Sequence, residues 1–213
     1  MNDVDFYLYD LKTKFDKINP KDYYLSYSGG KDSHLLYWFI KEYAHIDGIE
    51  IVGDNTFMEF PEIRDRIYKN SLRKGKTPAK TIQQKIDGTY DKGFKGISKK
   101  AREYVKSGNA HKITHLCCYY LKKKPFHDYE KETGKKPILG VRGEESLLRK
   151  TQYKSCFTSS GKFTPLYDLT QELEDKIIKQ YNIEVPKIYN YIDRTRMRRM
   201  PISEVGKAIQ TKS

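Results

Sequence analysis

The feature that most constrains the fold of this chain is a glycine turn between a short apolar run and an amphipathic segment. Residues 23–27 are rich in tyrosine and predict a strand, which Gly29 and Gly30 follow closely. Beyond the glycines, apolar side chains recur at helical spacing; they are Leu35, Leu36, Phe39, Ile40 and Tyr43. The order of strand, tight turn and helix is the building unit of a parallel α/β sheet.

The same order repeats further along the chain. Residues 49–52 predict a second strand, and Pro61 suits the first turn of the helix that follows. Residues 137–141 predict another buried strand, and residues 163–166 an edge strand in which Pro165 is tolerated. The βαβα order predicts an α/β fold with helices covering a parallel sheet.

The chain shows no internal repeat, linker or change of composition, so residues 1–213 are expected to form a single domain. Residues 1–20 predict a leading amphipathic helix, and residues 170–213 a basic, helical C-terminal part whose first helix is capped by Thr170. The Lys- and Gly-rich residues 73–100 predict a functional loop. Further helices are expected at residues 99–106 and 115–123.

Charge limits the kinds of partner. The net charge is +13, which favours polyanionic partners such as nucleic acid, although a soluble, highly charged surface explains it equally well. Four arginines fall within six residues, at Arg194, Arg196, Arg198 and Arg199. No apolar run reaches the length of a membrane span, and the N-terminus lacks the pattern of a signal peptide. We therefore expect a cytoplasmic protein, with its oligomeric state left open.

The residues of the glycine turn suit phosphate binding. Glycines allow backbone amides to approach phosphate oxygens, and the start of a helix adds positive potential. Lys31 adds a full charge, and Asp32, which would repel phosphate, suits a bridging Mg²⁺ ion. The alternative is an ordinary glycine turn in which Asp32 and Ser33 cap a helix. The segment does not fit the Walker pattern.

Six blocks in order resemble the PAPS (phosphoadenosine phosphosulfate) reductase-like family of the N-type ATP pyrophosphatases, over residues 23 to about 190. The first is the loop Ser28-Gly29-Gly30-Lys31-Asp32-Ser33, the pyrophosphate motif of that family. The others are Asp54-Asn55-Thr56-Phe57-Met58-Glu59-Phe60-Pro61-Glu62, Phe94-Lys95-Gly96-Ile97-Ser98-Lys99-Lys100, Cys117-Cys118-Tyr119-Tyr120-Leu121-Lys122-Lys123-Lys124-Pro125, Gly140-Val141-Arg142-Gly143-Glu144-Glu145-Ser146 with Arg149, and Pro165-Leu166-Tyr167-Asp168-Leu169-Thr170.

The resemblance implies a Rossmann-like sheet of about five parallel strands with an adenine nucleotide at its carboxyl edge. It implies that the loop residues hold phosphates; these are Ser28, Gly29, Gly30, Lys31, Asp32 and Ser33. It also implies that Arg142 and Arg149 contact phosphate or sulfate, whereas the alternative is a surface ion pair with Glu144 or Glu145. Asp54 is expected to face the nucleotide.

Two departures concern cysteine. Sulfite-forming reductases of the family use a cysteine near the C-terminus, and this chain has none after Cys156. Related proteins carry a [4Fe–4S] cluster on a double cysteine and further cysteines, and the chain offers Cys117, Cys118 and Cys156. The final pair of cysteines expected by resemblance is missing from residues 194–201. Three thiolates could hold a cluster with one open iron, but we favour the reading in which the site has decayed.

Three functions follow from these residues. The first is an enzyme that splits ATP into AMP and pyrophosphate and adenylates a substrate, with Lys31, Asp32 and Arg142 as its catalytic residues and sulfur transfer to nucleic acid as one version. The second is a reductase of PAPS or adenylyl sulfate with an unusual nucleophile. The third is a nucleotide- or nucleic-acid-binding module without turnover, in which residues 194–199 supply a basic edge.

Overall fold

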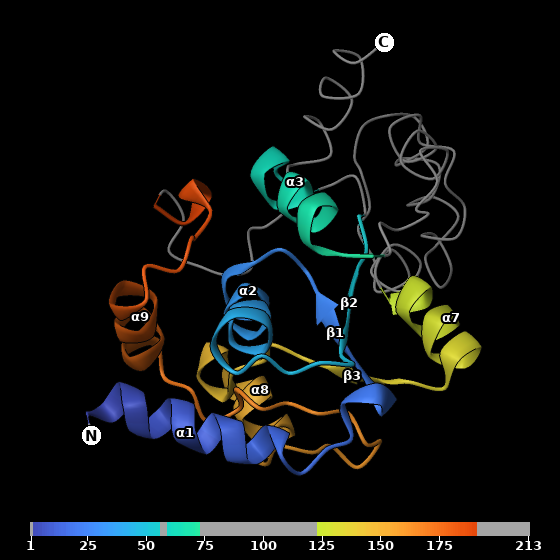
Figure 1. Ribbon diagram of the computed structural model, residues 1–213, viewed down its shortest axis with the longest axis horizontal. Coiled ribbons are helices and arrows are strands. Elements are labelled where there is room, and N and C mark those ends of the chain that lie inside the picture. The colour runs from blue at the N-terminus through green and yellow to red at the C-terminus, as the bar shows by residue number, and fades with distance from the viewer. Residues whose placement is uncertain (1, 56–58, 73–122, 191–213) are drawn as a thin grey trace, which may run out of the picture.

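The computed structural model describes residues 2–55, 59–72 and 123–190 (Figure 1). Its strands are β1 (Tyr23–Tyr27), β2 (Glu50–Gly53) and β3 (Lys136–Ile138). Its α-helices are α1 (Asp3–Phe15), α2 (Lys31–Trp38), α3 (Pro61–Asn70), α7 (Lys124–Thr133), α8 (Leu147–Gln152) and α9 (Gln171–Gln180). Short 3₁₀ turns cover Pro20–Asp22, Gly143–Glu145 and Lys187–Asn190, and a π-helical turn, Phe39–Tyr43, continues α2.

The three described strands are parallel and lie in the order β2-β1-β3. β1 is central: Tyr27 is in register with Gly53 of β2, and Leu25 with Ile138 of β3. The chain therefore moves from β1 to one side and later returns to the other side. The loop after β1 consequently lies where the strand order reverses, which is where parallel α/β sheets bind ligands.

The two faces of the sheet are covered by different helices. Leu25 and Tyr27 point into the main core, which also holds residues of α1, α2 and α9. Tyr24 points to the opposite face and packs with Val52 and with Tyr129 of α7. This alternation follows from the period of two along a strand. In Figure 1, α2 lies in front of the sheet and α7 beside it.

Local sequence signals explain where several helices begin and end. The side chain of Asn2 accepts a hydrogen bond from the amide of Asp5, and Asp5 returns one, which forms a capping box at α1. Thr170 caps α9 by accepting from the amide of Leu173 at 3.2 Å. Gly134, with φ of 72°, ends α7 in the left-handed conformation.

The predicted α/β fold with a parallel sheet and covering helices is confirmed. The described residues form three strands, however, and not about five. The strand expected at 137–141 ends at Ile138, and the edge strand expected at 163–166 is reduced to isolated bridges at Phe163. Pro165 has no N–H to extend this ladder, which explains why pairing stops.

Other predictions near the helices differ in detail. Leu72, expected on α3, lies beyond its end and is 74% exposed. The sequence did not predict α7, in which Pro125 stands in the first turn. The helices expected at residues 99–106 and 115–123 lie outside the described residues, as does the functional loop expected at 73–100.

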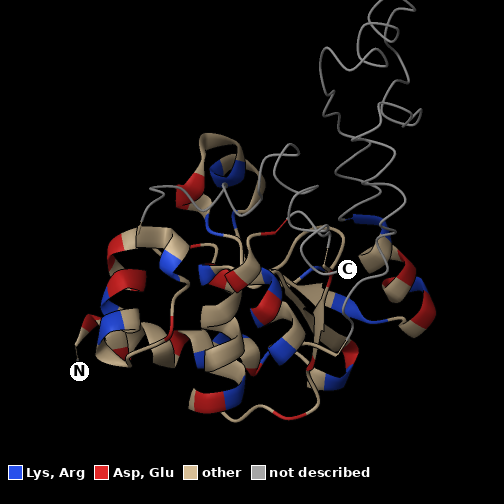
Figure 2. Cartoon of the chain, turned by 90° about the horizontal axis from the view of Figure 1, so that it is seen from above, with Lys and Arg blue, Asp and Glu red and all other residues tan. Residues whose placement is uncertain are grey.

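Figure 2 shows Lys and Arg interspersed with Asp and Glu over the described elements. Within the described ranges acidic residues balance basic ones, so the positive excess of the chain lies in residues 73–122 and 191–213. Of the described helices, none has the length and apolar character needed to cross a membrane.

Candidate functional site

The loop after β1 forms a tight turn that is held by its own hydroxyl groups. Gly29 has φ of 70°, and Gly30 caps the N-terminus of α2. Ser33 Oγ lies 3.0 Å from the Gly30 carbonyl oxygen, 3.0 Å from Ser28 Oγ and 3.2 Å from the amide nitrogen of Ser28, which donates to it. These contacts fix the two ends of the loop against each other.

Two glycines allow neighbouring backbone to approach this loop closely. A Cβ atom at Gly29 would lie 2.8 Å from the carbonyl oxygen of Ile63 in α3. A Cβ atom at Gly140, just after β3, would lie 2.9 Å from the amide nitrogen of Ser33. Both distances are too short for a side chain, so glycine at each position permits the loop to lie in contact with α3 and with the end of β3.

The amides of the first turn of α2 make this loop a candidate anion site. The first intrahelical bond runs from the amide of His34 to the carbonyl of Gly30 at 2.9 Å. The amides of Lys31, Asp32 and Ser33 precede it and have no partner within the helix. The amide of Lys31 donates to the hydroxyl of Tyr189 at 3.3 Å. Amides at a helix N-terminus attract anions.

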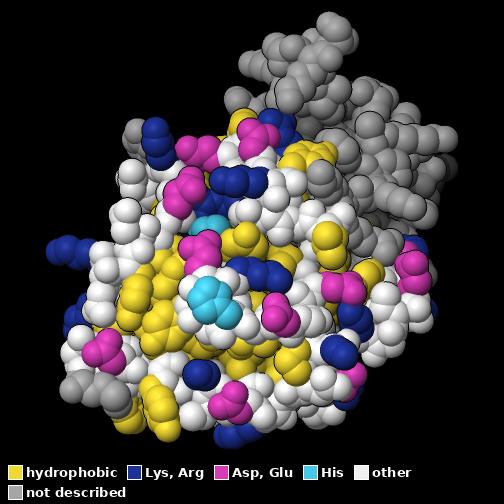
Figure 3. Space-filling model, in the orientation of Figure 1, with side chains coloured by type: hydrophobic (Ala, Val, Ile, Leu, Met, Phe, Trp, Pro, Cys, Tyr) yellow, Lys and Arg dark blue, Asp and Glu magenta, His cyan; other side chains and the backbone are white. Residues whose placement is uncertain are grey.

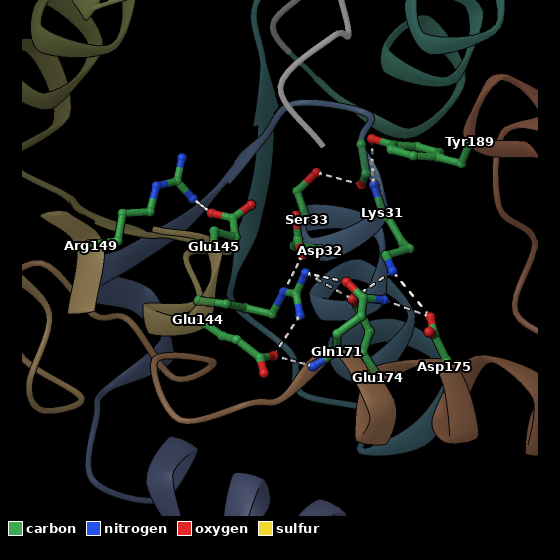
Figure 4. Close-up of polar contacts among 12 residues, drawn as sticks. Lys31, Asp32, Ser33, Glu144, Glu145, Arg149, Gln171, Glu174, Asp175 and Tyr189 are labelled. Carbon is green, nitrogen blue, oxygen red and sulfur yellow. Dashed lines mark hydrogen bonds and ion pairs between the residues drawn. The ribbon is translucent and has the colours of Figure 1, made fainter. Parts of the chain in front are cut away.

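Lys31 is held by two acidic residues of α9. Its Nζ lies 2.8 Å from Glu174 Oε2 and 3.2 Å from Asp175 Oδ1. The Lys31 side chain is 11% exposed, whereas that of Asp175 is 61% exposed. Figure 4 shows the ammonium group directed from the loop toward α9. The cation expected to meet phosphate is therefore ion-paired within the chain.

Arg142 forms the second half of this cluster. Its Nε donates to Asp32 Oδ1 at 2.7 Å, and its Nη2 donates to Gln171 Oε1 at 2.8 Å. Nη2 also lies 3.4 Å from Glu174 Oε2. Arg142, Asp32 and Glu174 are all buried. Removing any one of these charged groups would leave an uncompensated charge in the interior, which is strongly destabilising.

Glu174 is the most perturbed acid of the cluster. Burial, followed by the nearby charge of Asp32, raises the pKa of Glu174 from 4.5 to about 7, against the opposing effects of Arg142 and Lys31. Its Oε1 has no hydrogen-bond partner among the described residues, and Nη1 of Arg142 approaches only Glu144, at 3.9 Å. Buried polar atoms with incomplete hydrogen bonding are typical of sites that meet a ligand.

Arg149, the other arginine expected at phosphate, lies apart from this cluster. It pairs with Glu145 one helical turn earlier, and Figure 4 shows its guanidinium directed toward Glu145 on the side of α8. This contact matches the alternative that the sequence left open for it. For Arg142 the corresponding contact with Glu144 is only a long one, because its main partners are Asp32 and Gln171.

Asp54 lies near the loop, at the same edge of the sheet. It directly follows Gly53, which is in register with Tyr27, so Asp54 and Ser28 are adjacent at the carboxyl ends of β2 and β1. Asp54 is 8% exposed, and its neighbour Asn55 donates to the hydroxyl of Tyr68 at 2.7 Å. Its expected role toward a nucleotide stays a prediction.

The expected magnesium ion does not fit Asp32 as the side chain lies here. Asp32 has no exposed surface, and its Oδ1 accepts from Arg142, so it offers no open oxygen to an ion. No group of three or more His, Cys, Asp or Glu residues suited to a metal occurs within the described ranges. The magnesium role of Asp32 stays a prediction.

Of the three cysteines, the structure describes only Cys156. Cys156 is partly buried, and burial raises the pKa of its thiol, which keeps it protonated. Cys117, Cys118 and residues 194–199 lie outside the described residues. The iron–sulfur and basic-edge predictions stay open.

Four residues of the cluster were missed from the sequence: Gln171, Glu174, Asp175 and Tyr189. The first three follow the Thr170 cap at spacings that place them on one face of α9, which is a detectable signal. Nothing in the sequence, however, indicates that this face packs against a loop some 140 residues earlier.

Comparison with known proteins supports the fold. No family model matches the chain, and no curated protein matches it by sequence. Among solved structures, it is similar to a PAPS reductase from Candida auris in a phosphate complex, with a TM-score of 0.52 and 16% identity over 87% of this chain and 84% of that one. It is also similar to an NH₃-dependent NAD synthetase from Campylobacter jejuni, with a TM-score of 0.50 and 15% identity over 98% and 82%.

A third similar structure is a glutamine-dependent NAD⁺ synthetase from Acinetobacter baumannii in complex with ADP. Its TM-score is 0.52 at 15% identity, and the match covers 99% of this chain but only 39% of that longer one. PAPS reductase and NAD synthetase both belong to the N-type ATP pyrophosphatase superfamily. The chain therefore shares the fold of these enzymes, and the fold that the sequence resemblance implied is confirmed.

Proposed function

We propose that the chain is an enzyme that binds an adenine nucleotide at residues 28–33 and splits ATP into AMP and pyrophosphate, so that an acceptor becomes adenylated. The observation that carries this proposal is the convergence of two cations on one loop. Lys31 follows β1 and Arg142 follows β3, and both contact Glu174 of α9. The glycines at 29 and 140 let the loop pack closely against α3 and against the end of β3.

The proposed reaction is a displacement at the α-phosphorus. An oxygen of the acceptor forms a bond to this phosphorus, and the bond to the oxygen that bridges to the β-phosphorus breaks. The electron pair of the broken bond stays on pyrophosphate. Lys31 and Arg142 neutralise the developing charge, and the amides of Lys31, Asp32 and Ser33 hold the departing phosphates.

Binding requires an exchange of partners at Lys31. Its ammonium is 2.8 Å from Glu174 and 3.2 Å from Asp175, so a phosphate must take the place of at least one carboxylate. Asp175 is largely exposed and can turn into water at little cost. Tyr189 likewise has to release the Lys31 amide if that amide is to reach phosphate.

Transfer of sulfur to nucleic acid is the version of this reaction that suits the charge of the chain. The positive excess lies in residues 73–122 and 191–213, and includes Arg194, Arg196, Arg198 and Arg199. Such a concentration of charge favours a polyanionic acceptor. Iron content and visible absorption of protein purified without oxygen test whether Cys117, Cys118 and Cys156 hold a cluster.

A second candidate is reduction of PAPS or adenylyl sulfate, because one similar structure is a PAPS reductase. The raised pKa of Cys156 makes this thiol a poor nucleophile, which weighs against it in that role. Release of sulfite from either substrate with a thiol donor would favour the reductase. Nucleotide binding without any turnover would instead favour the third candidate, a binding module.

The central experiment measures pyrophosphate release from ATP in the presence of Mg²⁺ and of bulk tRNA or DNA. We expect Lys31→Ala to lower the rate by about 100-fold or more, the scale of loss on removing a group that stabilises transition-state charge. Lys176→Ala is the matched control, because Lys176 is an exposed lysine of α9 paired with Glu172. Absence of pyrophosphate from the wild-type protein, or equal rates for the two variants, contradicts the proposal.

A further inference from the structure

A cavity of about 670 Å³ lies on the flank of α2, beside the loop but distinct from it. Its walls are one face of α2, one face of α3 and the segment 181–187, and the lining includes His34, Tyr37 and Trp38. This volume falls in the range of small-ligand sites. Figure 3 views this side of the molecule, where hydrophobic side chains gather over α2 and charged ones toward α3. The proposed ATP chemistry uses none of these residues.

Two cations of the lining, Arg66 and Lys69, act on His34. The pKa of His34 is lowered to about 3, first by burial and then by the charges of Arg66 and Lys69. His34 is therefore neutral at physiological pH, and the charges that act on it are positive. Arg66 is buried, whereas Lys69 is exposed at the last turn of α3.

The hydrogen bonds around His34 decide which ring nitrogen carries its proton. Asn70 donates from Nδ2 to the hydroxyl of Tyr27 at 3.1 Å, so the hydroxyl hydrogen is free to point to Nδ1 of His34 at 2.9 Å. Nδ1 then accepts, and the ring proton lies on Nε2. His34 thus offers an N–H donor at a wall of the cavity.

The carboxylates in the lining are largely engaged by other groups. Glu184 pairs with Arg66 at 3.2 Å, and its carbonyl accepts from the same guanidinium at 2.7 Å. Glu62 accepts from the amide of Ile188 at 3.2 Å, and Asp65 pairs with Arg64 at 2.9 Å; the remaining acid of the lining is Glu42. Lys69 forms no ion pair with the part of the chain that the structure describes, so its charge is available to a ligand.

Another part of the lining is aromatic, and it adjoins His34. Trp38 and Tyr181 lie with their ring centroids 4.9 Å apart, and Tyr37 is stacked on His34 at 5.4 Å. Flat, partly apolar rings are suited to stacking with a planar heterocycle. The cavity therefore offers cations that suit an oxyanion and, next to His34, rings that suit a heterocycle.

We propose that this cavity binds a mononucleotide, with its phosphate at His34, Arg66 and Lys69 and its base toward Tyr37, Trp38 and Tyr181. The ligand is either a free nucleoside monophosphate or the phosphorylated end of a nucleic acid, which share this chemistry. The inference goes beyond the proposed ATP cleavage, because it uses a different surface of α2 and does not depend on turnover.

The chain contains a single tryptophan, Trp38, so its fluorescence reports this cavity directly. AMP, adenosine, inorganic phosphate and a 5′-phosphorylated oligonucleotide are titrated separately against the full chain. We expect saturable quenching by AMP or by the oligonucleotide, about tenfold weaker binding for Lys69→Ala, and similar weakening when adenosine replaces AMP. The relative affinities of AMP and the oligonucleotide identify the source of the ligand.

Two controls separate this site from the loop. Lys131→Ala removes an exposed lysine from the last turn of α7, as Lys69→Ala does from α3, and should leave the titration unchanged. In a Lys31→Ala background, in which binding at the loop is impaired, Lys69→Ala should still weaken the titration by about tenfold. The proposal is overturned if neither phosphorylated ligand quenches Trp38, or if Lys69→Ala binds as tightly as the wild-type protein.

Discussion

Two clusters of the described residues, one around Arg142 and one around Lys14, differ in how their carboxylates meet water. At the loop, Arg142 lies between Asp32 and Glu174, whose side chains are both 0% exposed. Near the C-terminal end of α1, Lys14 lies 2.9 Å from Asp10 and 2.7 Å from Asp168, which are 42% and 37% exposed. Loss of Arg142 would leave the buried carboxylates of Asp32 and Glu174 without this partner. Loss of Lys14 would leave Asp10 and Asp168 in contact with water.

The Lys14 cluster is also more completely satisfied. Its ammonium lies 5.2 Å from the ring centroids of both Tyr7 and Tyr167, and Tyr7 donates to Asp168 at 3.3 Å. The loop cluster keeps buried atoms of Glu174 and Arg142 with incomplete hydrogen bonding. The Lys14 cluster therefore links α1 to the segment before α9. The loop cluster, by contrast, has buried groups that can exchange partners with a ligand.

The largest expected effect tests the loop cluster. Arg142→Met should lower the free energy of unfolding by about 3–5 kcal/mol, because it strands the buried charges of Asp32 and Glu174. Urea unfolding at neutral pH measures it. If the unfolding free energy falls by less than about 1 kcal/mol, these carboxylates are hydrated as easily as those around Lys14, and the two clusters do not differ in this respect.

A smaller effect concerns pH. The pKa of Glu174 in the folded protein is about 7, above its ordinary 4.5, so the folded state keeps a proton that the unfolded chain loses. Stability contributed by this group is therefore present at low pH and lost as pH rises from about 4.5 to about 7, by about 3 kcal/mol at most.

Glu174→Gln should remove that decline. Unfolding free energies of the wild-type and variant proteins, measured from pH 4.5 to pH 8, give the difference directly, and other titrating groups cancel. A variant that declines in parallel with the wild-type protein would show that burial does not shift the Glu174 carboxyl, which would weaken its distinction from Asp10 and Asp168.

The smallest effect is expected at α1. Lys14→Met keeps the apolar stem of the side chain and leaves Asp10 and Asp168 partly in water, so we expect a loss of about 1 kcal/mol or less. Thermal and urea unfolding beside Arg142→Met measure the contrast. If Lys14→Met lowers the unfolding free energy as much as Arg142→Met does, the two clusters do not differ in their dependence on the cation.

The sequence predicted those parts of the fold that local signals determine. β1 was predicted with its observed bounds, because a run of apolar and aromatic residues ends at a glycine turn. α7 was missed, although Pro125 stands in its first turn, a position that proline favours.

The candidate site was predicted in part for the same reason. Residues 28–33 carry a local motif, and the structure places them at the carboxyl end of β1. The role of Glu174 depends on the packing of α9 beside α2, which no short-range pattern encodes. Arg149 is the opposite case. It matches a position of the motif, but in the structure its side chain pairs with Glu145, four residues earlier.

The placement of α3 has a mechanical consequence. One side of this helix touches Gly29 through Ile63, and another side carries Arg66 and Lys69 into the neighbouring cavity. A tilt of α3 would therefore move the floor of one site and the wall of the other together. If both sites bind, any effect of one occupant on the affinity of the other is reciprocal and of equal size.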